Sequence, residues 1–242
     1  MEHRVSVIFL GTGPANGIQG TKRDRRRESS IILRVDKCDY LFDVTNDFGW
    51  QKNFLRNLKG VFITHGHNDA IGGIGGLSIW HKDQRLKNPI PLYTHPRTIF
   101  HIKKAFSDVN YLEFKRIIPN QAVEIGRCLE IIPISVPHSI QPGFPTYAFL
   151  ITIFKKTILY ASDVGEINDD LRELFDDLNI LILDGAMWKK RIKSHLEITK
   201  TLPKICQEKI KRIYFTQIGK TVPHYKTFKK EVEQICRKAE PA

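Results

Sequence analysis

The chain has 242 residues, of which 41% are hydrophobic and 26% are charged. These values are ordinary for a globular protein with a buried core, and they argue against a disordered or fibrous chain. Lys and Arg total 38 against 26 Asp and Glu, and the net charge of +12 favours anionic partners such as phosphate esters or nucleic acid. A lysine-rich proteome would give the same excess without any such partner, so charge alone does not decide.

The sequence shows no segment that addresses a membrane. Its apolar runs are far too short to cross a bilayer, and its first residues lead into a strand-like segment without the apolar stretch of a signal peptide. We therefore expect a cytoplasmic protein. The scattered cysteines lack metal-binding spacing, so in a reducing compartment we expect free, mostly buried thiols at Cys38, Cys128, Cys206 and Cys236.

Strand and helix patterns alternate along the chain, without a repeat, linker or low-complexity tract. Two packed sheets with outer helices would explain this order, and we expect a single domain over residues 1–242. Apolar runs between turn residues predict strands at Val5–Leu10, Ser30–Val35, Tyr40–Asp43, Gly60–Ile63, Pro91–Thr94, Gln121–Ile125, Cys128–Val136, Tyr147–Ile153, Thr157–Ala161, Ile180–Asp184 and Arg212–Thr216. Amphipathic runs predict helices at Ile74–Asp83, His95–Phe106, Asp169–Phe175, His195–Lys209 and Tyr225–Lys238.

The strongest chemical signal is the run from Thr64 to Asp69, His-x-His-x-Asp, which leaves a predicted strand and leads into Gly72-Gly73. In an extended segment, residues two apart face the same side, so His65 and His67 can direct both imidazoles at one point, and Asp69 continues that face if the backbone stays extended. Imidazole and carboxylate suit zinc or a similar divalent metal. The glycines would let the backbone turn away sharply while the loop stays close to the ion.

Three further polar residues follow predicted strands. His138, Asp163 and Asp184 each come where an apolar run ends, and ligand groups gather at strand ends because the sheet fixes the backbone there. Each of these residues alone would more often cap a turn. Their recurrence beside the histidine motif favours a metal site.

The ordered set of motifs resembles the metallo-β-lactamase superfamily, in the branch of ribonuclease Z and the PhnP-type cyclic phosphodiesterases. The resemblance implies an αββα sandwich of two mixed sheets with outer helices, and it covers nearly the whole chain. The matching pieces are Phe9–Gly13, Arg25–Ser30, Leu41–Val44 before Asp47-Phe48, Thr64–Asp69, Pro137–Ser139, Tyr160–Asp163, Leu181–Asp184, Ser194–Leu196 and Tyr214–Thr216.

The resemblance also implies a ligand set. One metal, zinc with manganese as the alternative, would be held by His65, His67, His138 and Asp163. The family's second metal takes the motif aspartate, the histidine after it, the bridging aspartate and a C-terminal histidine. Here the two histidine positions carry Ala70 and Gln217. Because both losses fall on the same ion, we expect a mononuclear centre. His224, seven residues after Gln217, is a substitute ligand in principle, but a histidine in a solvated loop or at a helix cap explains it better.

By the same resemblance, hydrolysis would proceed through a mononuclear metal-bound hydroxide. Asp69 would act as general base and His195, at the start of a predicted helix, as general acid. Asp184 would orient a ligand histidine, and Gln217 would also lie just outside the ligands. The basic run of Lys22, Arg23, Arg25, Arg26 and Arg27 would contact substrate phosphates, although a solvated loop explains it equally well.

We expect a phosphodiesterase acting on a nucleotide or RNA-type phosphodiester. The chain shows no glycine-rich or proline-rich arm of the kind that ribonuclease Z uses to grip transfer RNA, which favours a smaller substrate or another gripping surface. Three alternatives remain: hydrolysis of a non-phosphate ester, an impaired enzyme that serves as a nucleic-acid or partner-binding module, and an accessory protein of the PQQ pathway. The resemblance makes a homodimer plausible.

Overall fold

The computed structural model describes residues 3–18, 25–138 and 144–242. The chain divides into two compact units, each built around its own sheet. The first unit contains residues 1–17 and 27–117, and the second contains residues 18–26 and 118–242. The sequence prediction of a single domain over residues 1–242 stays a prediction.

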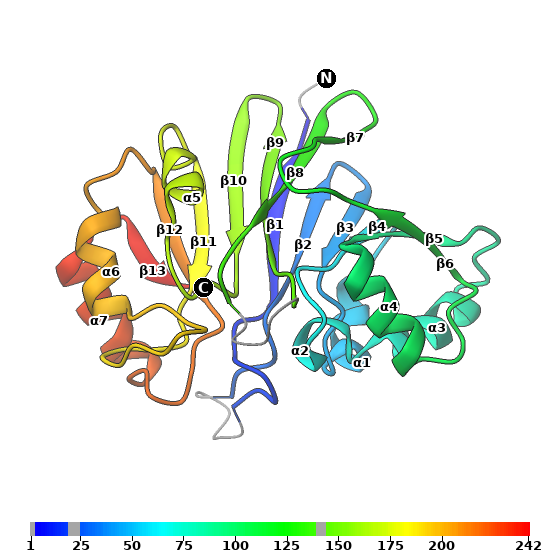
Figure 1. Ribbon diagram of the computed structural model, residues 1–242, viewed down its shortest axis with the longest axis horizontal. Coiled ribbons are helices and arrows are strands. Elements are labelled where there is room, and N and C mark those ends of the chain that lie inside the picture. The colour runs from blue at the N-terminus through cyan, green and yellow to red at the C-terminus, as the bar shows by residue number, and fades with distance from the viewer. Residues whose placement is uncertain (1–2, 19–24, 139–143) are drawn as a thin grey trace. The chain divides into compact units, whose positions relative to one another are not determined.

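Within the described residues, the first unit holds a six-stranded mixed sheet. Its strands lie side by side in chain order: β1 (Val5–Gly11), β2 (Ser30–Val35), β3 (Cys38–Phe42), β4 (Leu58–Phe62), β5 (Ile90–Thr94) and β6 (Leu112–Arg116) (Figure 1). The first three strands pair antiparallel and the last four pair parallel.

Parallel neighbours need a crossover, and short helices provide it. These are α1 (Phe48–Gln51), the 3-10 helix Lys52–Phe54, α2 (Asn68–Ile71), α3 (Ile74–Asp83) and α4 (Pro96–Ala105). Leu41, Val61 and Leu92 of the strands are fully buried and share one apolar cluster with Ile74 and Leu77 of α3. This cluster fixes the strand ends from which the histidine motif emerges.

The second unit's described residues form a seven-stranded mixed sheet. In order across the sheet its strands are β13 (Ala239–Pro241), β12 (Arg212–Thr216), β11 (Ile180–Asp184), β10 (Lys156–Ala161), β9 (Tyr147–Ile153), β8 (Leu129–Ser135) and β7 (Val123–Ile125). Strands β10 to β13 pair parallel and β7 to β10 pair antiparallel. The helices are α5 (Asp169–Glu173), α6 (Ile198–Ile205) and α7 (Tyr225–Ile235).

The apolar core of the second unit holds in place the strands after which its candidate site residues lie. Leu159, Leu181 and Ile213, one from each of three neighbouring parallel strands, pack with Leu202 of α6 and Phe228 of α7. Because β8 and β10 are both antiparallel to β9, strands β8, β10, β11 and β12 all run in the same direction. Their carboxyl ends therefore lie at one edge of the sheet.

The structure corrects the expectation for the cysteines. Cys206 and Cys236 form a disulfide, while Cys38 is half-buried and Cys128 is exposed. The partners are the C-cap residues of α6 and α7, which the core brings together across 30 positions of sequence. Spacing alone gave no sign of this pairing.

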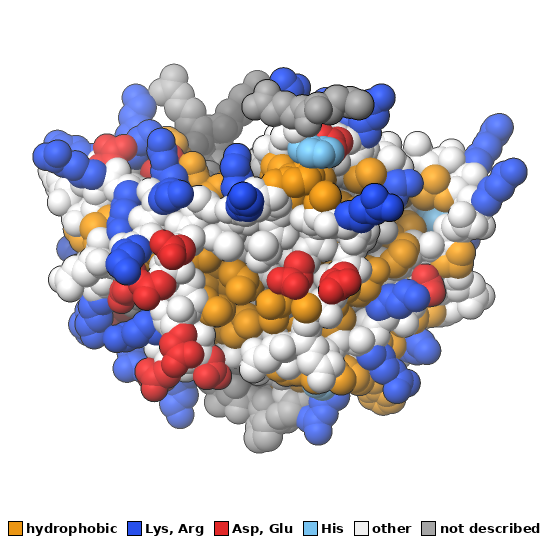
Figure 2. Space-filling model, turned by 90° about the horizontal axis from the view of Figure 1, so that it is seen from above, with side chains coloured by type: hydrophobic (Ala, Val, Ile, Leu, Met, Phe, Trp, Pro, Cys, Tyr) orange, Lys and Arg blue, Asp and Glu red, His pale blue; other side chains and the backbone are white. Residues whose placement is uncertain are grey.

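Among the described helices, none combines the length and the apolar character that crossing a membrane requires. On the face drawn in Figure 2, Lys and Arg side chains outnumber Asp and Glu and are interspersed with them, in keeping with the net charge of +12.

Candidate metal centre

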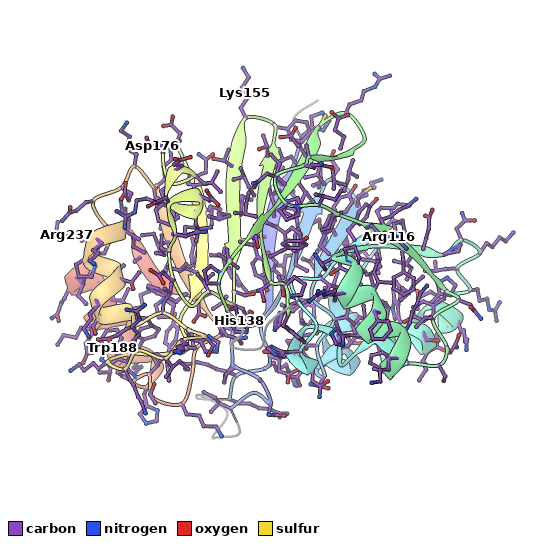
Figure 3. All side chains as sticks on the ribbon, in the orientation of Figure 1. Arg116, His138, Lys155, Asp176, Trp188 and Arg237 are labelled. Atoms are coloured by element: carbon purple, nitrogen blue, oxygen red, sulfur yellow. A yellow bond between two sulfur atoms is a disulfide. The ribbon has the colours of Figure 1, made fainter. Side chains whose placement is uncertain are left out.

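In the second unit, the candidate site residues follow strands that run in one direction. His138 comes after β8, Asp163 after β10, and Gln217 after β12, while Asp184 ends β11. Their clustering follows from the parallel pairing of β10, β11 and β12, because the carboxyl ends of parallel strands meet at one edge. Figure 3 shows His138 at the end of its strand.

His138, Asp163 and His195 form a cluster in which one possible ligand atom of each lies within 4.8 Å of the others. Nε2 of His138 lies 3.7 Å from Oδ1 of Asp163. This separation is too long for a hydrogen bond, and it is close to the distance of about 3.4 Å between two donors on one tetrahedral zinc ion. The donor types and their spacing therefore fit a divalent metal.

Hydrogen bonds orient both histidines of this cluster. Nδ1 of His138 lies 2.7 Å from the carbonyl oxygen of Ser194, so this nitrogen carries the proton and Nε2 is the nitrogen with a lone pair to offer a metal. Nδ1 of His195 lies 2.6 Å from Oδ2 of Asp184. We expected Asp184 to orient a metal ligand; in the structure its partner is instead His195, the residue expected to act as the acid.

Asp184 is held in place by backbone groups as well. Its carboxylate accepts hydrogen bonds from the backbone N–H groups of Val164 and Ala186. Complete burial raises the pKa of Asp184, and the contact with His195 opposes that rise. A buried carboxylate beside an imidazole favours the protonated imidazole, which is the form that a general acid needs.

The position of His195 differs from the sequence expectation. It lies three residues before the start of α6, in a loop, where its backbone forms an isolated β-bridge with Ile192. Glu197, not His195, is the N-cap residue of the helix. His195 therefore does not cap the helix, and its ring contacts Asp184 instead.

Gln217 occupies the position of the family's C-terminal histidine ligand, and its side chain contacts Asp163. The amide Nε2 donates a hydrogen bond of 2.7 Å to Oδ1 of Asp163. Gln217 is 3% exposed, and its backbone is left-handed, with φ of 56°. The same carboxylate oxygen that lies near His138 thus already accepts an amide proton.

In the first unit, His65 and His67 follow β4, with ring centroids 4.7 Å apart and the rings edge to face. His65 is fully buried, and its Nδ1 lies 2.8 Å from Oγ1 of Thr64. The Thr64 hydroxyl in turn donates to Asp43, whose backbone has φ of 63°. This chain of bonds sets the tautomer of His65, with the proton on Nδ1 and a lone pair on Nε2 to offer a metal.

Asp69 reaches His65 by a route that we did not expect. The backbone is extended at His67 but turns into α2 at Asn68, so Asp69 lies in the first turn of a helix rather than on an extended face. Its Oδ1 lies 3.6 Å from Nε2 of His65. The turn into α2 thus brings Asp69 back towards His65, four residues earlier in the chain.

The glycines after the motif serve close packing rather than a sharp turn. Gly72 and Gly73 have φ of −60° and −87°, values open to any residue. A Cβ at Gly72 would overlap the side chain of Asn46, and one at Gly73 would overlap the carbonyl oxygen of Thr45. They therefore hold the motif against the loop that follows β3.

The remaining predicted residues lie as follows. Ala70 is buried in α2, and the exposed His224 is the N-cap residue of α7. In the basic run, Arg25 is exposed and Arg26 bridges to Ile18 through its backbone. Lys22 and Arg23 lie outside the described residues.

Arg27 has a structural environment that weakens the substrate-binding expectation. It pairs with Asp47 at 3.3 Å, and its guanidinium lies 4.2 Å from the ring centroid of Trp50. A side chain engaged in both an ion pair and a ring contact has little freedom to reach a phosphate.

The sequence analysis assigned no role to four residues that orient the site residues: Asp43, Thr64, Ser194 and Gly165. Asp43 and Thr64 stood inside the recognised motifs without an assigned role. Ser194 acts through its backbone carbonyl, which no side-chain pattern reveals. Gly165 lies where a Cβ would overlap the carbonyl oxygen of Lys193 and approach that of Pro137 at 3.1 Å, so it joins three loops of the cluster.

Comparisons with known proteins identify the family and the fold of the chain. A family model described as the beta-lactamase superfamily domain matches residues 40–218. Ribonuclease Z of Methanococcus aeolicus is 26% identical over 200 residues, which cover 76% of this chain. The chain spans 59% of the length of that relative.

Two solved structures share the fold. A diphosphatase of the PhnP family superposes with a TM-score of 0.85 at 23% identity, covering 99% of this chain and 95% of that one. Zinc-bound PqqB from Methylobacterium extorquens gives a TM-score of 0.81 at 19% identity, covering 100% of this chain and 97% of that one. The predicted fold class, two mixed sheets with helices, is confirmed. The chain belongs to the metallo-β-lactamase superfamily, whose family model matches it over residues 40–218.

Proposed function

We propose that this protein is a metal-dependent phosphodiesterase that works with one divalent ion, zinc or manganese. The observation that carries the proposal is the cluster of His138, Asp163 and His195, whose donor types and spacing suit a metal. The proposed ligands are His65 and His67 of the first unit with His138 and Asp163 of the second. The relatives named ribonuclease Z and PhnP-family diphosphatase support a phosphoester substrate.

The contact of Gln217 with Asp163 supports a single ion. A bridging carboxylate serves two metals by giving one oxygen lone pair to each, and here an amide proton occupies Oδ1. An amide nitrogen that donates a hydrogen bond cannot coordinate a cation. The neighbouring Ala70 offers no donor atom, so a second ion would retain too few ligands.

When bound, the ion would polarise the phosphoryl group and lower the pKa of a water molecule. Asp69 beside His65 is the proposed base that accepts the proton of the attacking water. His195, protonated and held by Asp184, is the proposed acid that donates a proton to the departing oxygen. The 20% exposure of the His195 side chain leaves it accessible to a substrate.

An anionic substrate suits the net charge of +12 and the exposed Arg25. Arg25 and Arg26 remain proposed phosphate contacts, whereas Arg27 is better explained by its contacts with Asp47 and Trp50. A homodimer and a cytoplasmic location remain parts of this proposal, each open to direct measurement.

The test combines elemental analysis with hydrolysis of bis-(p-nitrophenyl) phosphate, with and without added zinc or manganese. We expect about one ion per chain and turnover that depends on it. Ala70→His together with Gln217→His restores the family's second set of ligands, and the content should then rise towards two ions per chain. Bound metal without hydrolysis of phosphodiesters, esters or thioesters would favour a binding module instead. Absence of metal would contradict the proposal.

A further inference from the structure

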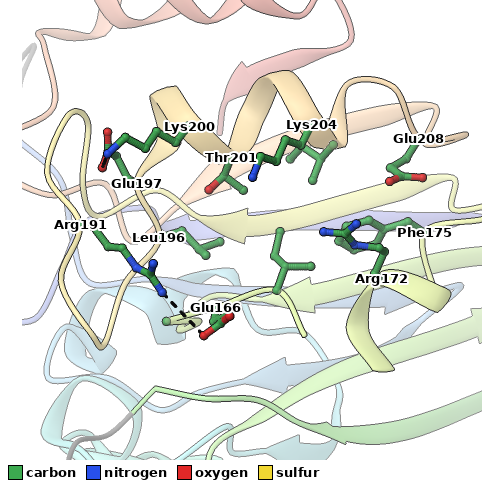
Figure 4. Close-up of a pocket in the computed structure, with 13 residues that line it drawn as sticks. Glu166, Arg172, Phe175, Arg191, Leu196, Glu197, Lys200, Thr201, Lys204 and Glu208 are labelled. Atoms are coloured by element: carbon green, nitrogen blue, oxygen red, sulfur yellow. Dashed lines mark ion pairs between the residues drawn. The ribbon is translucent and has the colours of Figure 1, made fainter. Parts of the chain in front are cut away.

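A groove of about 260 Å³ lies between α5 and α6 in the second unit. Thr201 and Lys204 line it from α6, and Arg172 of α5 extends from the opposite side (Figure 4). Two donors on one wall thus face a guanidinium group on the other.

Two of the four cations in the lining already have acidic partners. Arg191 lies 3.7 Å from Glu166, and Lys200 lies 3.0 Å from Glu197. Because each of these cations faces a carboxylate, neither pair adds net positive charge to the groove.

The other two cations, Arg172 and Lys204, are exposed and form no ion pair with any residue that the structure describes. Glu208, the remaining acid of the lining, follows the end of α6, and Figure 4 shows it beyond Lys204. The acidic residues of α5 lie outside the lining. The part of the groove between Arg172 and Lys204 therefore attracts anions.

The size and the apolar lining of the groove favour a small ligand. Its volume is less than the range of about 300–1,000 Å³ that is typical of sites for drug-sized molecules. Phe175 and Leu196 belong to the lining but are only 1% and 6% exposed, so they offer no face on which a nucleobase could stack. Charge, rather than apolar contact, decides what binds here.

The groove adjoins the candidate metal cluster through two short stretches of backbone. Leu196 in its lining directly follows His195, and Gly165 in its lining is two residues beyond Asp163. The N–H group of Gly165 donates to the carbonyl oxygen of Pro137 in the loop after β8. A ligand in the groove would therefore lie beside loops that carry members of the cluster.

We propose that Arg172, Lys204 and Thr201 bind a phosphate dianion, as inorganic phosphate or as a small phosphomonoester, at a site separate from the metal cluster. The guanidinium can donate two parallel hydrogen bonds to phosphate oxygens, and the ammonium and hydroxyl groups donate from the other wall. Two positive charges match the charge of about −2 on a phosphomonoester at neutral pH.

Hydrolysis of a phosphodiester releases a phosphomonoester, so the groove would hold a product of the proposed reaction. This assignment of the ligand as a product rests on the proposed function, whereas the binding of a phosphate dianion does not.

The test titrates isotope-labelled, zinc-loaded protein with inorganic phosphate and follows the backbone amide signals by NMR. The amides of Thr201 and Ile205 report on the groove, and those of His138 and Asp163 report on the metal cluster. We expect saturable shifts at the groove amides, with a Kd separate from that of any binding at the cluster. Shifts confined to the cluster would overturn the proposal.

Two variants remove the proposed contacts. Arg172→Gln with Lys204→Gln should weaken phosphate binding at the groove by about tenfold or more, because hydrogen bonds from charged donors are the stronger ones. Thr201→Val keeps the shape of the side chain and should weaken binding by about threefold, the contribution of one neutral hydrogen bond. Unchanged affinity in the double variant would contradict the proposal.

A matched pair of substitutions controls for net charge. Lys226→Gln with Lys230→Gln removes the same charge from exposed positions of α7 outside the lining. Binding should stay within about twofold, because distant exposed charges are screened by salt. Equal losses in the two double variants would mean that net charge alone attracts phosphate, against the proposal. Circular dichroism and thermal melting establish that all variants fold.

Further ligands identify the source of the phosphate group. If glycerol phosphate binds the groove more tightly than inorganic phosphate, the ligand is a phosphomonoester; the reverse order identifies inorganic phosphate. Dimethyl phosphate, a monoanion, should bind at least about fivefold more weakly than either. Equal binding of dimethyl phosphate would contradict the match to a dianion. Shifts of the groove amides with single-stranded RNA that lacks a terminal phosphate would also overturn the proposal.

Hydrolysis of bis-(p-nitrophenyl) phosphate separates this proposal from the proposed function. If the protein hydrolyses no phosphodiester but phosphate binding depends on Arg172 and Lys204, the function is wrong and the phosphate site stands. If the protein is active but the groove amides do not respond to phosphate, the phosphate site is wrong and the function stands.

Discussion

Two residues at the candidate site have a backbone conformation that non-glycine residues rarely adopt. Asp43 has φ of 63° and Gln217 has φ of 56°, and such a residue costs on the order of 1 kcal/mol. Each is compensated by side-chain bonds: Asp43 accepts from both the N–H and the hydroxyl of Thr64, and Gln217 donates to Asp163. The strained backbone thus places Gln217 against the proposed ligand Asp163, and it places Asp43 against Thr64, which contacts the proposed ligand His65.

The pair of His195 and Asp184 leads to a prediction about acid catalysis. His195→Ala should lower kcat by about 10²- to 10⁴-fold, the usual contribution of a general acid, while the metal content stays unchanged. Asp184→Asn should lower kcat less. It should also move the alkaline limb of the pH–rate profile to lower pH, because the neutral amide no longer favours the protonated imidazole.

Steady-state kinetics across pH and elemental analysis of the same samples check this prediction. Loss of metal in His195→Ala would show that His195 acts as a ligand, since it also lies within ligand distance of His138 and Asp163. A pH profile unchanged in Asp184→Asn would contradict the orienting role of Asp184.

At the scale of the elements, sequence patterns predicted the buried strands well and the short or polar elements poorly. Ser30–Val35, Tyr147–Ile153, Ile180–Asp184 and Arg212–Thr216 match the observed strands residue for residue. These strands are rich in Ile, Leu and aromatic residues and pack into the cores, so periodicity and propensity agree. The element containing Leu112–Arg116 was missed because it is a charged strand at the sheet edge.

Helix boundaries near the site were the weakest part of the prediction. The helix expected from His195 begins at Ile198, and the helix α2 that contains Asp69 was not expected at all. Tertiary contacts decide the backbone conformation at both residues. His195 is held by its hydrogen bond to Asp184, and the segment that contains Asp69 packs against Asn46. Sequence motifs could therefore indicate which residues take part, but not the contacts that orient them.

The connection between β2, β3 and β4 depends on Asp39. Its carboxylate accepts from Arg34 at 2.6 and 3.1 Å and from the backbone N–H of Arg56 at 2.7 Å. Although burial opposes the shift, the bonds to Arg34 and Arg56 lower the pKa of Asp39. The stabilisation is therefore present above the unfolded-state pKa near 3.9 and is lost as pH falls through the lower folded-state pKa.

Asp39→Asn should lower the free energy of unfolding at neutral pH by about 3 kcal/mol, because Arg34 loses its buried partner. The loss should begin to shrink below about pH 4, where Asp39 of the unfolded chain takes up a proton, and should vanish as pH falls through the lower folded-state pKa. Urea unfolding at several pH values measures both effects. Asp83→Asn, at an exposed position, is the control and should change stability by less than about 0.5 kcal/mol. An equal loss at acidic and neutral pH would mean that charge does not matter at Asp39.

The disulfide joins the ends of α6 and α7 and predicts a thiol count. Protein alkylated at cell lysis and then unfolded without reductant should show two thiols, from Cys38 and Cys128. Cys206→Ser with Cys236→Ser should lose about 3.5 kcal/mol by the loop-entropy relation. Cys38→Ser with Cys128→Ser is the control and should melt like the unmutated protein. Four thiols at lysis would instead agree with a reducing cytoplasm in which the bond does not form.

At the scale of the whole molecule, the proposed ligand set draws two residues from each compact unit. His65 and His67 belong to the first unit, and His138 and Asp163 belong to the second. An ion that binds only the folded protein raises its stability by RT ln(1 + [L]/Kd), about 2.7 kcal/mol when the free ion is at 100 times Kd. Removing the ion with a chelator should therefore lower the melting temperature of the unmutated protein, and added zinc should restore it.

Single substitutions then show whether both units take part. His65→Ala from one unit and His138→Ala from the other should each abolish the response of the melting temperature to chelator and zinc, because a tetrahedral site that loses one of four ligands binds its ion far more weakly. His224→Ala, at an exposed helix cap, should respond like the unmutated protein. If only one of the two ligand variants lost the response, the ion would be held within that unit alone and the shared ligand set would be wrong. If both kept it while the unmutated protein responded, the ion would bind elsewhere in the chain.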